Sequence, residues 1–249
     1  MQRIIRWNEH VWYKIIVVRL IKVIIPAYNE AASIAQVVRA IPGFISEVIV
    51  VDNKSTDGTG KVAELAGATV IAQPKAGYGN ACLMGLAYLA AQAPPPNIVV
   101  FIDGDYSDYA EDMEAILQPI LEEDIDFVVG ARVAALREKN SMTPQQLWGN
   151  KLATYLMQII YGSRFTDLGP FRAIKYDKLL ALEMSDTTYG WTVEMQLKAL
   201  RRNVTYREVP VRYRARIGHS KISGTLRGTV LAGIKIIGWI FKYSIQKNG

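Results

Sequence analysis

The sequence has few of the residues that form disulfides or bind zinc. Its 249 residues include one cysteine, Cys82, and two histidines, His10 and His219. A single cysteine excludes an internal disulfide and is typical of a protein in a reducing compartment. So few nitrogen and sulfur ligands give no basis for a zinc site. Cys82 falls within a helical pattern, where we expect a small buried apolar side chain.

The sequence also lacks a long apolar run. No uncharged segment reaches the ~18 to 20 apolar residues of a membrane-spanning helix. The first residues, MQRIIRWNEHVWYKIIVVRLIK, are interrupted by charged side chains throughout and do not resemble a secretory signal. The most apolar segment near the C-terminus, GTVLAGIKIIGWIFKYSI, contains Lys235 and Lys242. We therefore expect a cytoplasmic protein that binds at a membrane surface without crossing it.

Positive charge exceeds negative charge in this chain. Lys and Arg number 29 against 23 Asp and Glu, for a net charge of +6. This excess favours anionic partners, which include phosphates, nucleic acid and an anionic membrane surface. The basic residues are dispersed and match no nucleic-acid-binding module, so nucleic acid is not an expected partner.

Up to residue 132, short apolar runs alternate with helical patterns, which is typical of parallel strands joined by crossover helices. The predicted strands are 22–26, 47–52, 68–72, 98–103 and 126–132. The predicted helices between them are 29–41, 55–67, 77–92 and 110–123. Further on, the predicted elements are helices over 143–162 and 191–203, a loop over 163–174 and an alternating strand over 204–213. The pattern predicts one α/β domain whose second half elaborates the first.

Polar segments follow three of the predicted strands. They are PAYNE (26–30), DNKSTDGT (52–59) and DGDYSD (103–108). Each alone has a simple explanation, because Pro26 can end a strand and an aspartate can cap a helix. In open α/β sheets, however, ligands bind beyond the carboxyl ends of the strands. Three such segments at one sheet edge favour a ligand site.

Asp103 and Asp105 have a more specific implication. If strand geometry continues past residue 103, these two side chains point the same way and repel each other unless a cation lies between them. The residues alone leave both a helix cap and a cation site open.

Four segments together resemble the nucleotide-sugar half of a family 2 glycosyltransferase with the GT-A fold. They are VIIPAYNE, VIVVDNKSTDGT, GYGNAC and the Asp-x-Asp sequence DGD, in the family's order and spacing over residues 22–132. Three later segments resemble, more loosely, the polyprenyl-phosphate hexosyltransferases of the dolichol-phosphate mannosyltransferase group. These are DLGPFRAI, WTVEMQLKA and RIGHSKISG.

The resemblance implies an α/β fold of the GT-A (Rossmann-like) type, a mostly parallel sheet flanked by helices. Residues 21–222 would form this domain, with a nucleotide-sugar half over 21–132 and an acceptor half over 133–222. An N-terminal extension over 1–20 would precede it, and an amphipathic helix over 223–249 would follow.

Two positions are open to this C-terminal helix. Arg227, Lys235 and Lys242 fall along one stripe, and the other faces are largely apolar. A helix in the membrane interface would direct this stripe toward anionic headgroups. A spanning helix would instead place Lys235 near the bilayer centre, at about 2.5 to 3.5 kcal/mol. The alternative is packing against the protein's own core or a partner subunit.

The resemblance also implies a site for a nucleotide sugar, GDP-mannose or a UDP-hexose. Asp103 and Asp105 would hold Mg²⁺ or Mn²⁺, hard cations that bind carboxylate and phosphate oxygens, and Asp105 would act in catalysis. The resembled group usually has Gln two residues beyond its second Asp, where this chain has Ser107, so Asp108 would supply or relay a metal contact. Asp52 would accept hydrogen bonds from the base or ribose. The implied donor-site residues are Pro26, Ala27, Tyr28, Glu30, Asp52, Gly77, Gly79, Asp103 and Gly104.

The second half would bind a polyprenyl phosphate as the acceptor. Its implied phosphate ligands are Arg132, Arg172, Arg216, Ser220 and Lys221. Arg132 would also act in catalysis, and a solvated charge is the alternative at each of these basic positions. A phosphate oxygen is already a nucleophile and needs no strong base. Glu194 would act as a base only for a hydroxyl acceptor, and with a phosphate acceptor it would orient arginines. Tyr189 and Trp191 would pack against a sugar ring or within the core.

These features predict a metal-dependent, inverting enzyme that transfers one hexose from a nucleotide sugar to a polyprenyl phosphate at the cytoplasmic face of a membrane. The nearest alternative keeps this donor chemistry with a soluble or protein-bound hydroxyl acceptor. A more distant one is a non-catalytic, membrane-associated module that binds nucleotide sugars. A membrane-protein partner and a homo-oligomer are both compatible with the sequence.

Overall fold

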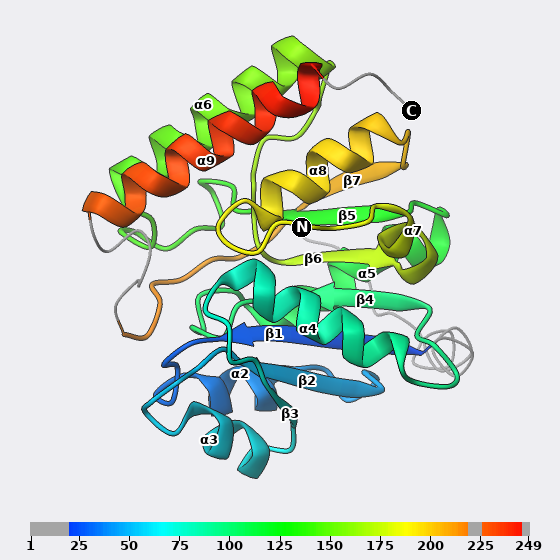
Figure 1. Ribbon diagram of the computed structural model, residues 1–249, viewed down its shortest axis with the longest axis vertical. Coiled ribbons are helices and arrows are strands. Elements are labelled where there is room, and N and C mark those ends of the chain that lie inside the picture. Colours follow the sequence, from blue (N-terminus) through cyan, green and yellow to red (C-terminus); the bar gives the residue numbers. More distant parts are fainter. Residues whose placement is uncertain (1–19, 219–225, 246–249) are drawn as a thin grey trace, which may run out of the picture.

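The computed structural model describes residues 20–218 and 226–245. The strands in these residues are β1 (Ile21–Ala27), β2 (Glu47–Asp52), β3 (Thr69–Ala72), β4 (Ile98–Phe101), β5 (Phe127–Ala131), β6 (Arg172–Lys175) and β7 (Tyr206–Pro210). They form one sheet in the order β3-β2-β1-β4-β6-β5-β7 (Figure 1). Neighbouring strands are parallel except for β6, which runs antiparallel to β4 and β5. The predicted α/β fold with a mostly parallel sheet is confirmed.

The central strands are buried on both faces of the sheet. In β1, Val23 and Ile25 join the hydrophobic cluster on one face, and Ile24 joins the cluster on the other. In β2, Val50 and Ile49 divide between the same two clusters. Side chains of a strand alternate between faces, so a strand with a core on each side has a continuous apolar sequence.

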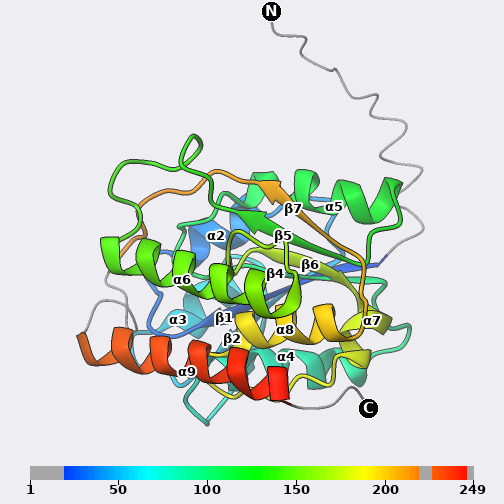
Figure 2. The ribbon, with the colours of Figure 1, turned by 90° about the horizontal axis from the view of Figure 1, so that it is seen from above.

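Helices cover both faces of the sheet (Figure 2). The helices that contribute to one cluster are α4 (Tyr78–Ala90), α6 (Pro144–Tyr161), α7 (Tyr176–Ala181), α8 (Trp191–Arg201) and α9 (Leu226–Ile245). Those that contribute to the opposite cluster are α2 (Ile34–Ala40), α3 (Thr59–Leu65) and α5 (Met113–Glu122). A short 3-10 helix, η1 (Ala110–Asp112), leads into α5.

Local sequence sets both ends of α6. Thr143 and Gln146 form a capping box, in which each side chain accepts a hydrogen bond from the other residue's amide. Pro144 occupies the first helical position, where its missing N–H costs nothing. Gly162, at φ 64°, ends the helix in the left-handed conformation. The predicted helix over 143–162 is confirmed.

The predicted loop over 163–174 is wrong at its end, where Arg172–Lys175 forms β6 between β4 and β5. A four-residue strand is too short to show a period-two pattern in the sequence. Its pairing depends on strands that are distant along the chain. The insertion places Arg172 at the centre of the sheet.

The C-terminal helix α9 packs on the domain. Ile240 lies within a hydrophobic cluster, and the Tyr161 hydroxyl on α6 donates a hydrogen bond to its carbonyl oxygen at 2.5 Å. The prediction that Lys235 belongs to a membrane-facing stripe is wrong, because its ammonium lies 2.8 Å from the buried Asp186 carboxylate. The side chain of Arg227 lies outside those described. Within residues 20–218 and 226–245, no helix is long and apolar enough to cross a membrane.

Candidate functional site

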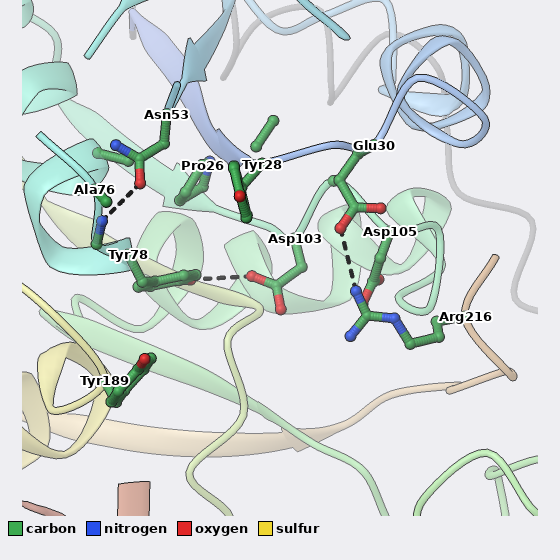
Figure 3. A pocket seen from close by; sticks show the side chains of 14 residues that line it. Pro26, Tyr28, Glu30, Asn53, Ala76, Tyr78, Asp103, Asp105, Tyr189 and Arg216 are labelled. Atoms are coloured by element: carbon green, nitrogen blue, oxygen red, sulfur yellow. Dashed lines mark hydrogen bonds and ion pairs between the residues drawn. The ribbon is translucent and has the colours of Figure 1, made fainter. Parts of the chain in front are cut away.

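A cavity of about 280 Å³ opens where β1, β2 and β4 end and α4 begins. These three strands are parallel neighbours, so the polar segments that follow them meet at one edge of the sheet. Figure 3 shows the lining side chains, which come from both halves of the sequence. They belong to Pro26, Ala27, Tyr28, Glu30, Asn53, Ala76, Gly77, Tyr78, Ala81, Asp103, Gly104, Asp105, Tyr189 and Arg216.

The structure brings most of the predicted donor-site residues to this cavity, but two lie outside its lining. Asp52 accepts a hydrogen bond from the Ser55 amide at 3.0 Å and so shapes the turn after β2. The Gly79 amide donates to the Thr188 carbonyl oxygen at 3.1 Å. A Cβ on Gly79 would lie 1.9 Å from the Asp186 carbonyl oxygen. Glycine at position 79 therefore serves close packing of α4 rather than contact with a ligand.

Two polar side chains of the cavity were not predicted. Asn53 accepts a hydrogen bond from the Gly77 amide at 2.8 Å and donates to the Lys75 carbonyl oxygen at 2.7 Å, which fixes the start of α4. The Tyr78 hydroxyl donates to the Asp103 carboxylate at 3.0 Å. Both residues lie inside the segments that carry the family resemblance, and their contacts span more than twenty positions of sequence.

Burial and neighbouring carboxylates raise the pKa of two aspartates after β4, Asp103 and Asp108. Burial, and then the charge of Asp105, raises the pKa of Asp103 to about 7. Burial, and then the charges of Asp103 and Asp105, raises the pKa of Asp108 well above its usual value. Both carboxylate oxygens of Asp108 are buried and have no hydrogen-bond partner among the described residues. The region therefore favours the arrival of positive charge.

Asp103 and Asp105 fit the requirements of a hard divalent cation. Ser107 donates two hydrogen bonds to Asp105 Oδ1, from its amide at 2.9 Å and its hydroxyl at 2.6 Å, and so orients this carboxylate. In the described part of the chain, no three His, Cys, Asp or Glu side chains converge closely enough to hold a metal ion. Mg²⁺ is commonly bound by one or two carboxylates together with substrate phosphates and water, which matches a pair of aspartates.

Arg216 lies at this cavity rather than with the other predicted acceptor ligands. One guanidinium nitrogen is 3.2 Å from Glu30 Oε1 and also 3.2 Å from Asp105 Oδ2. Its Nε is buried without a hydrogen-bond partner in the part of the chain that the structure describes. The Ile217 amide donates to the Asp105 carbonyl oxygen at 3.0 Å and holds this segment in place. The structure therefore groups Arg216 with the residues predicted to bind the donor.

The guanidinium groups of Arg132 and Arg172 are both engaged inside the protein. Arg132 forms two side-chain hydrogen bonds to Asp167, at 2.6 and 2.8 Å. Arg172 is fully buried and donates to the carbonyl oxygens of Gly169 and Thr192. Arg172 is fully buried and out of reach of a phosphate, which corrects its predicted role. Arg132 is paired with Asp167, and its role as a phosphate ligand stays a prediction. The predicted ligands Ser220 and Lys221, and His219 beside them, lie outside the described residues.

Glu194 is not placed to act as a base in the cavity. Its carboxylate is fully buried, accepts hydrogen bonds from the Ser185 hydroxyl at 2.7 Å and the Asp186 amide at 2.8 Å, and pairs with Lys198 at 2.9 Å. The predictions that Glu194 acts as a base or orients arginines are therefore corrected. Its carboxylate instead holds residues 185 and 186 in place.

The two aromatic residues near Glu194 have different environments. Trp191 is buried, and its ring centroid lies 6.0 Å from that of Phe101, so it belongs to the core. Tyr189 lines the cavity and is partly exposed. Trp191 therefore packs within the core, whereas Tyr189 lies where it is accessible to a ligand.

A second cavity, of about 200 Å³, lies in the predicted acceptor half. The Arg132–Asp167 pair forms part of its wall, together with Asn150. Arg137 also lines this cavity, and one of its guanidinium nitrogens lies 3.5 Å from the Met142 sulfur. Arg137 was not predicted, because a single arginine in a loop has no local pattern.

Comparison with protein families finds a match to glycosyl transferase family 2 over residues 22–182. An uncharacterized glycosyltransferase of Mycobacterium tuberculosis is 34% identical over 219 residues, which cover 85% of this chain and 94% of the relative. The undecaprenyl-phosphate mannosyltransferase of Micrococcus luteus is 28% identical over 227 residues, which cover 85% of this chain and 90% of that enzyme.

Among solved structures, glucosyl-3-phosphoglycerate synthase of Mycobacterium tuberculosis resembles this chain with a TM-score of 0.77. The sequences are 21% identical, and the match covers 100% of this chain and 88% of the synthase, which was solved with Mn²⁺, UDP and glucosyl-3-phosphoglycerate. The same synthase was also solved with Mg²⁺ and UDP, at a TM-score of 0.74. At this identity the likeness shows the fold, and the predicted GT-A fold is confirmed.

Proposed function

The chain belongs to glycosyl transferase family 2, and we propose on this premise that it transfers a hexose from a nucleotide sugar to a polyprenyl phosphate with inversion. The observation that carries the proposal is the joining of Asp103, Asp105 and Arg216 at one cavity on the carboxyl edge of the sheet. Two carboxylates and a guanidinium suit a diphosphate that binds together with a divalent cation. The similarity to the undecaprenyl-phosphate mannosyltransferase supports the choice of acceptor.

In this proposal Asp103 and Asp105 hold Mg²⁺ or Mn²⁺, which would neutralise the charge on the departing nucleoside diphosphate. The partly exposed rings of Tyr28 and Tyr189 line the cavity and offer flat surfaces to a base or a sugar. Arg216 exchanges its contacts with Glu30 and Asp105 for the diphosphate. A guanidinium binds phosphate with charge-assisted hydrogen bonds, so this exchange costs little.

The acceptor chemistry does not require a base from the protein. A phosphate oxygen of the polyprenyl phosphate is already anionic when it attacks the anomeric carbon. The bond between that carbon and the diphosphate oxygen breaks, and the nucleoside diphosphate leaves with the electron pair. We assign the acceptor phosphate to Arg137 in the wall of the second cavity, because the guanidinium groups of Arg132 and Arg172 already bond to groups inside the protein.

A membrane-anchored acceptor needs a lipid-facing surface, and we assign this surface to α6 and α9. The two helices lie side by side as an outer layer (Figures 1 and 2). Neither contains Asp or Glu, and Lys151 and Lys242 are exposed on them. Their exposed large apolar residues are Leu147, Trp148, Tyr155, Ile159, Leu231, Ile234, Phe241 and Ile245. Apolar side chains together with Trp, Tyr and Lys but no acid suit an anionic lipid surface.

A donor screen tests the proposal. Purified protein is incubated with Mn²⁺, undecaprenyl phosphate and a series of radiolabelled UDP- and GDP-hexoses, and the label extracted into butanol is counted. We expect one donor to label the lipid and Asp105→Asn to abolish the labelling. A protein that binds the donors but labels no lipid would contradict the proposed acceptor.

A hydroxyl acceptor is the second candidate, because the structurally similar synthase was solved with glucosyl-3-phosphoglycerate. Such an acceptor must lose a proton, so its rate should depend on the ionisation of a base. The carboxylates that line the cavity are those of Glu30, Asp103 and Asp105. A water-soluble product in the same screen would favour this candidate.

A further inference from the structure

The inner face of α9 contacts the wall of the donor cavity through one buried carboxylate. The Lys235 ammonium lies 2.8 Å from Asp186 Oδ2, and the indole N–H of Trp239 donates to the same oxygen at 2.7 Å. Lys235 also donates to the Thr188 hydroxyl at 2.5 Å. Two side chains one helical turn apart thus hold one segment, residues 185–190, from the C-terminal helix.

Asp186 ties α9 to the fold of this segment. Its side chain is fully buried, and its second oxygen, Oδ1, accepts hydrogen bonds from the amides of Thr188 at 2.7 Å and Gly190 at 3.1 Å. One oxygen therefore shapes the 185–190 segment while the other binds the helix. A buried carboxylate without its cation is strongly destabilised, so this arrangement requires Lys235 to stay in place.

The 185–190 segment in turn packs on the start of α4 with little free space. The amides of Gly79 and Asn80 donate to the carbonyl oxygens of Thr188 and Thr187, at 3.1 and 3.0 Å. A Cβ on Gly77 would lie 2.2 Å from the Thr187 carbonyl oxygen. Backbones in such contact move together, because neither has room to shift alone.

Both parts of this contact form walls of the donor cavity. Tyr189 comes from the 185–190 segment, and Gly77 and Tyr78 come from the start of α4. Tyr78 also donates its hydroxyl hydrogen bond to Asp103. The chain of contacts therefore runs from α9 through Asp186 to one of the carboxylates that would bind metal.

We propose that Lys235 and Trp239 are positioning residues for the nucleotide-diphosphate cavity. They act through Asp186 on the 185–190 segment and on Tyr78. This inference rests on the cavity being the donor site, and it is independent of which acceptor is used.

Other contacts also hold α9 on the domain, so we infer a more specific effect for the ionic contact. Ile240 and Tyr243 bury the helix in the core, and the Tyr161 hydroxyl bonds it to α6. A buried ion pair adds little net stability but requires a defined geometry. Its consequence is a fixed register between α9 and the cavity wall.

Three variants test the inference. Lys235→Met removes the cation, and Trp239→Phe removes the indole donor while keeping a ring. In the third, Asp186→Asn with Lys235→Met, the amide keeps an oxygen for Thr188 and Gly190 without leaving a buried charge. Lys235→Arg restores a cation. The matched control is Tyr161→Phe on α6. It removes a different hydrogen bond to α9, the one that the Tyr161 hydroxyl donates to the Ile240 carbonyl oxygen.

The measurement is the Kd of UDP and of GDP with Mn²⁺ by isothermal titration calorimetry, with circular dichroism to confirm folding. We expect roughly tenfold weaker binding in the three variants, because small displacements of a binding wall are costly, and near-normal binding in Lys235→Arg and Tyr161→Phe. If Lys235→Met fails to fold, Trp239→Phe and the double variant decide.

Two results would overturn the inference. The first is unchanged nucleotide affinity in folded variants, and the second is an equal loss in Tyr161→Phe, which would show that any loosening of α9 has the same effect. Wild-type protein that binds neither UDP nor GDP would instead contradict the assignment of the donor cavity itself.

Discussion

Replacing Asp103 by asparagine should stabilise the metal-free protein, and by more as the pH rises. Burial and then Asp105 raise the pKa of Asp103 from its ordinary 3.8 to about 7. Between these values the folded wild type holds a proton that the unfolded chain has released. The stability associated with this group is therefore fully present below about pH 4 and is lost as the pH rises through about 7. The asparagine of the variant has no charge to gain over this range.

The size of the effect follows from the width of this window. One pKa unit corresponds to about 1.36 kcal/mol, so the two units between pH 5 and pH 7 correspond to about 3 kcal/mol. The free energy of unfolding of Asp103→Asn, minus that of the wild type, should increase by about this amount from pH 5 to pH 8. Added Mn²⁺ should reduce this difference at pH 8, because it binds the paired carboxylates of the wild type more tightly than the single one left in the variant.

Urea unfolding in EDTA at pH 5 and pH 8, followed by circular dichroism, measures the difference. Glu114→Gln, an exposed change on α5, is the control and should show no such trend. A difference between Asp103→Asn and wild type that stays constant across this range would refute the argument that the paired carboxylates repel each other in the folded protein.

Three further predictions concern the donor site, the lipid surface and Glu194. Arg216→Ala should weaken UDP or GDP binding with Mn²⁺ by about ten- to a hundredfold, the loss of a charge-assisted contact; an unchanged calorimetric Kd would remove Arg216 from the donor site. Ile234→Ser with Phe241→Ser should reduce flotation with anionic liposomes at unchanged nucleotide affinity, and undiminished flotation would contradict a lipid-facing α9. Glu194→Gln should lower stability but leave the pH dependence of kcat unaltered, and a lost ionisation in that profile would show a base.

The sequence predicted well which polar segments of the first half meet at one sheet edge, because the signals for them are local. PAYNE and DGD follow strands that are parallel neighbours, and the apolar runs identify those strands without further information. The carboxyl ends of such strands share one edge, so Tyr28, Asp103 and Asp105 were expected together. The structure places all three at one cavity.

The acceptor half was less predictable because its contacts join distant positions. Arg132 pairs with Asp167, which lies 35 residues further along the chain, and no local pattern shows that the guanidinium is already engaged. Arg172 is buried because the short strand β6 inserts between β4 and β5. Lys235 looked like part of a basic stripe, and its partner Asp186 lies near the donor cavity rather than on the helix.

The central claim is the transfer of a hexose to the phosphate of a polyprenyl phosphate, and ³¹P NMR of the reaction tests it most directly. Undecaprenyl phosphate in detergent, the active nucleotide sugar and diamagnetic Mg²⁺ are mixed with the purified protein. The phosphomonoester resonance of the lipid should be replaced by a phosphodiester resonance as nucleoside diphosphate appears, and Asp105→Asn should leave it unchanged. Release of nucleoside diphosphate with the lipid phosphomonoester intact would contradict the account, because the sugar would then have gone to water or a hydroxyl group.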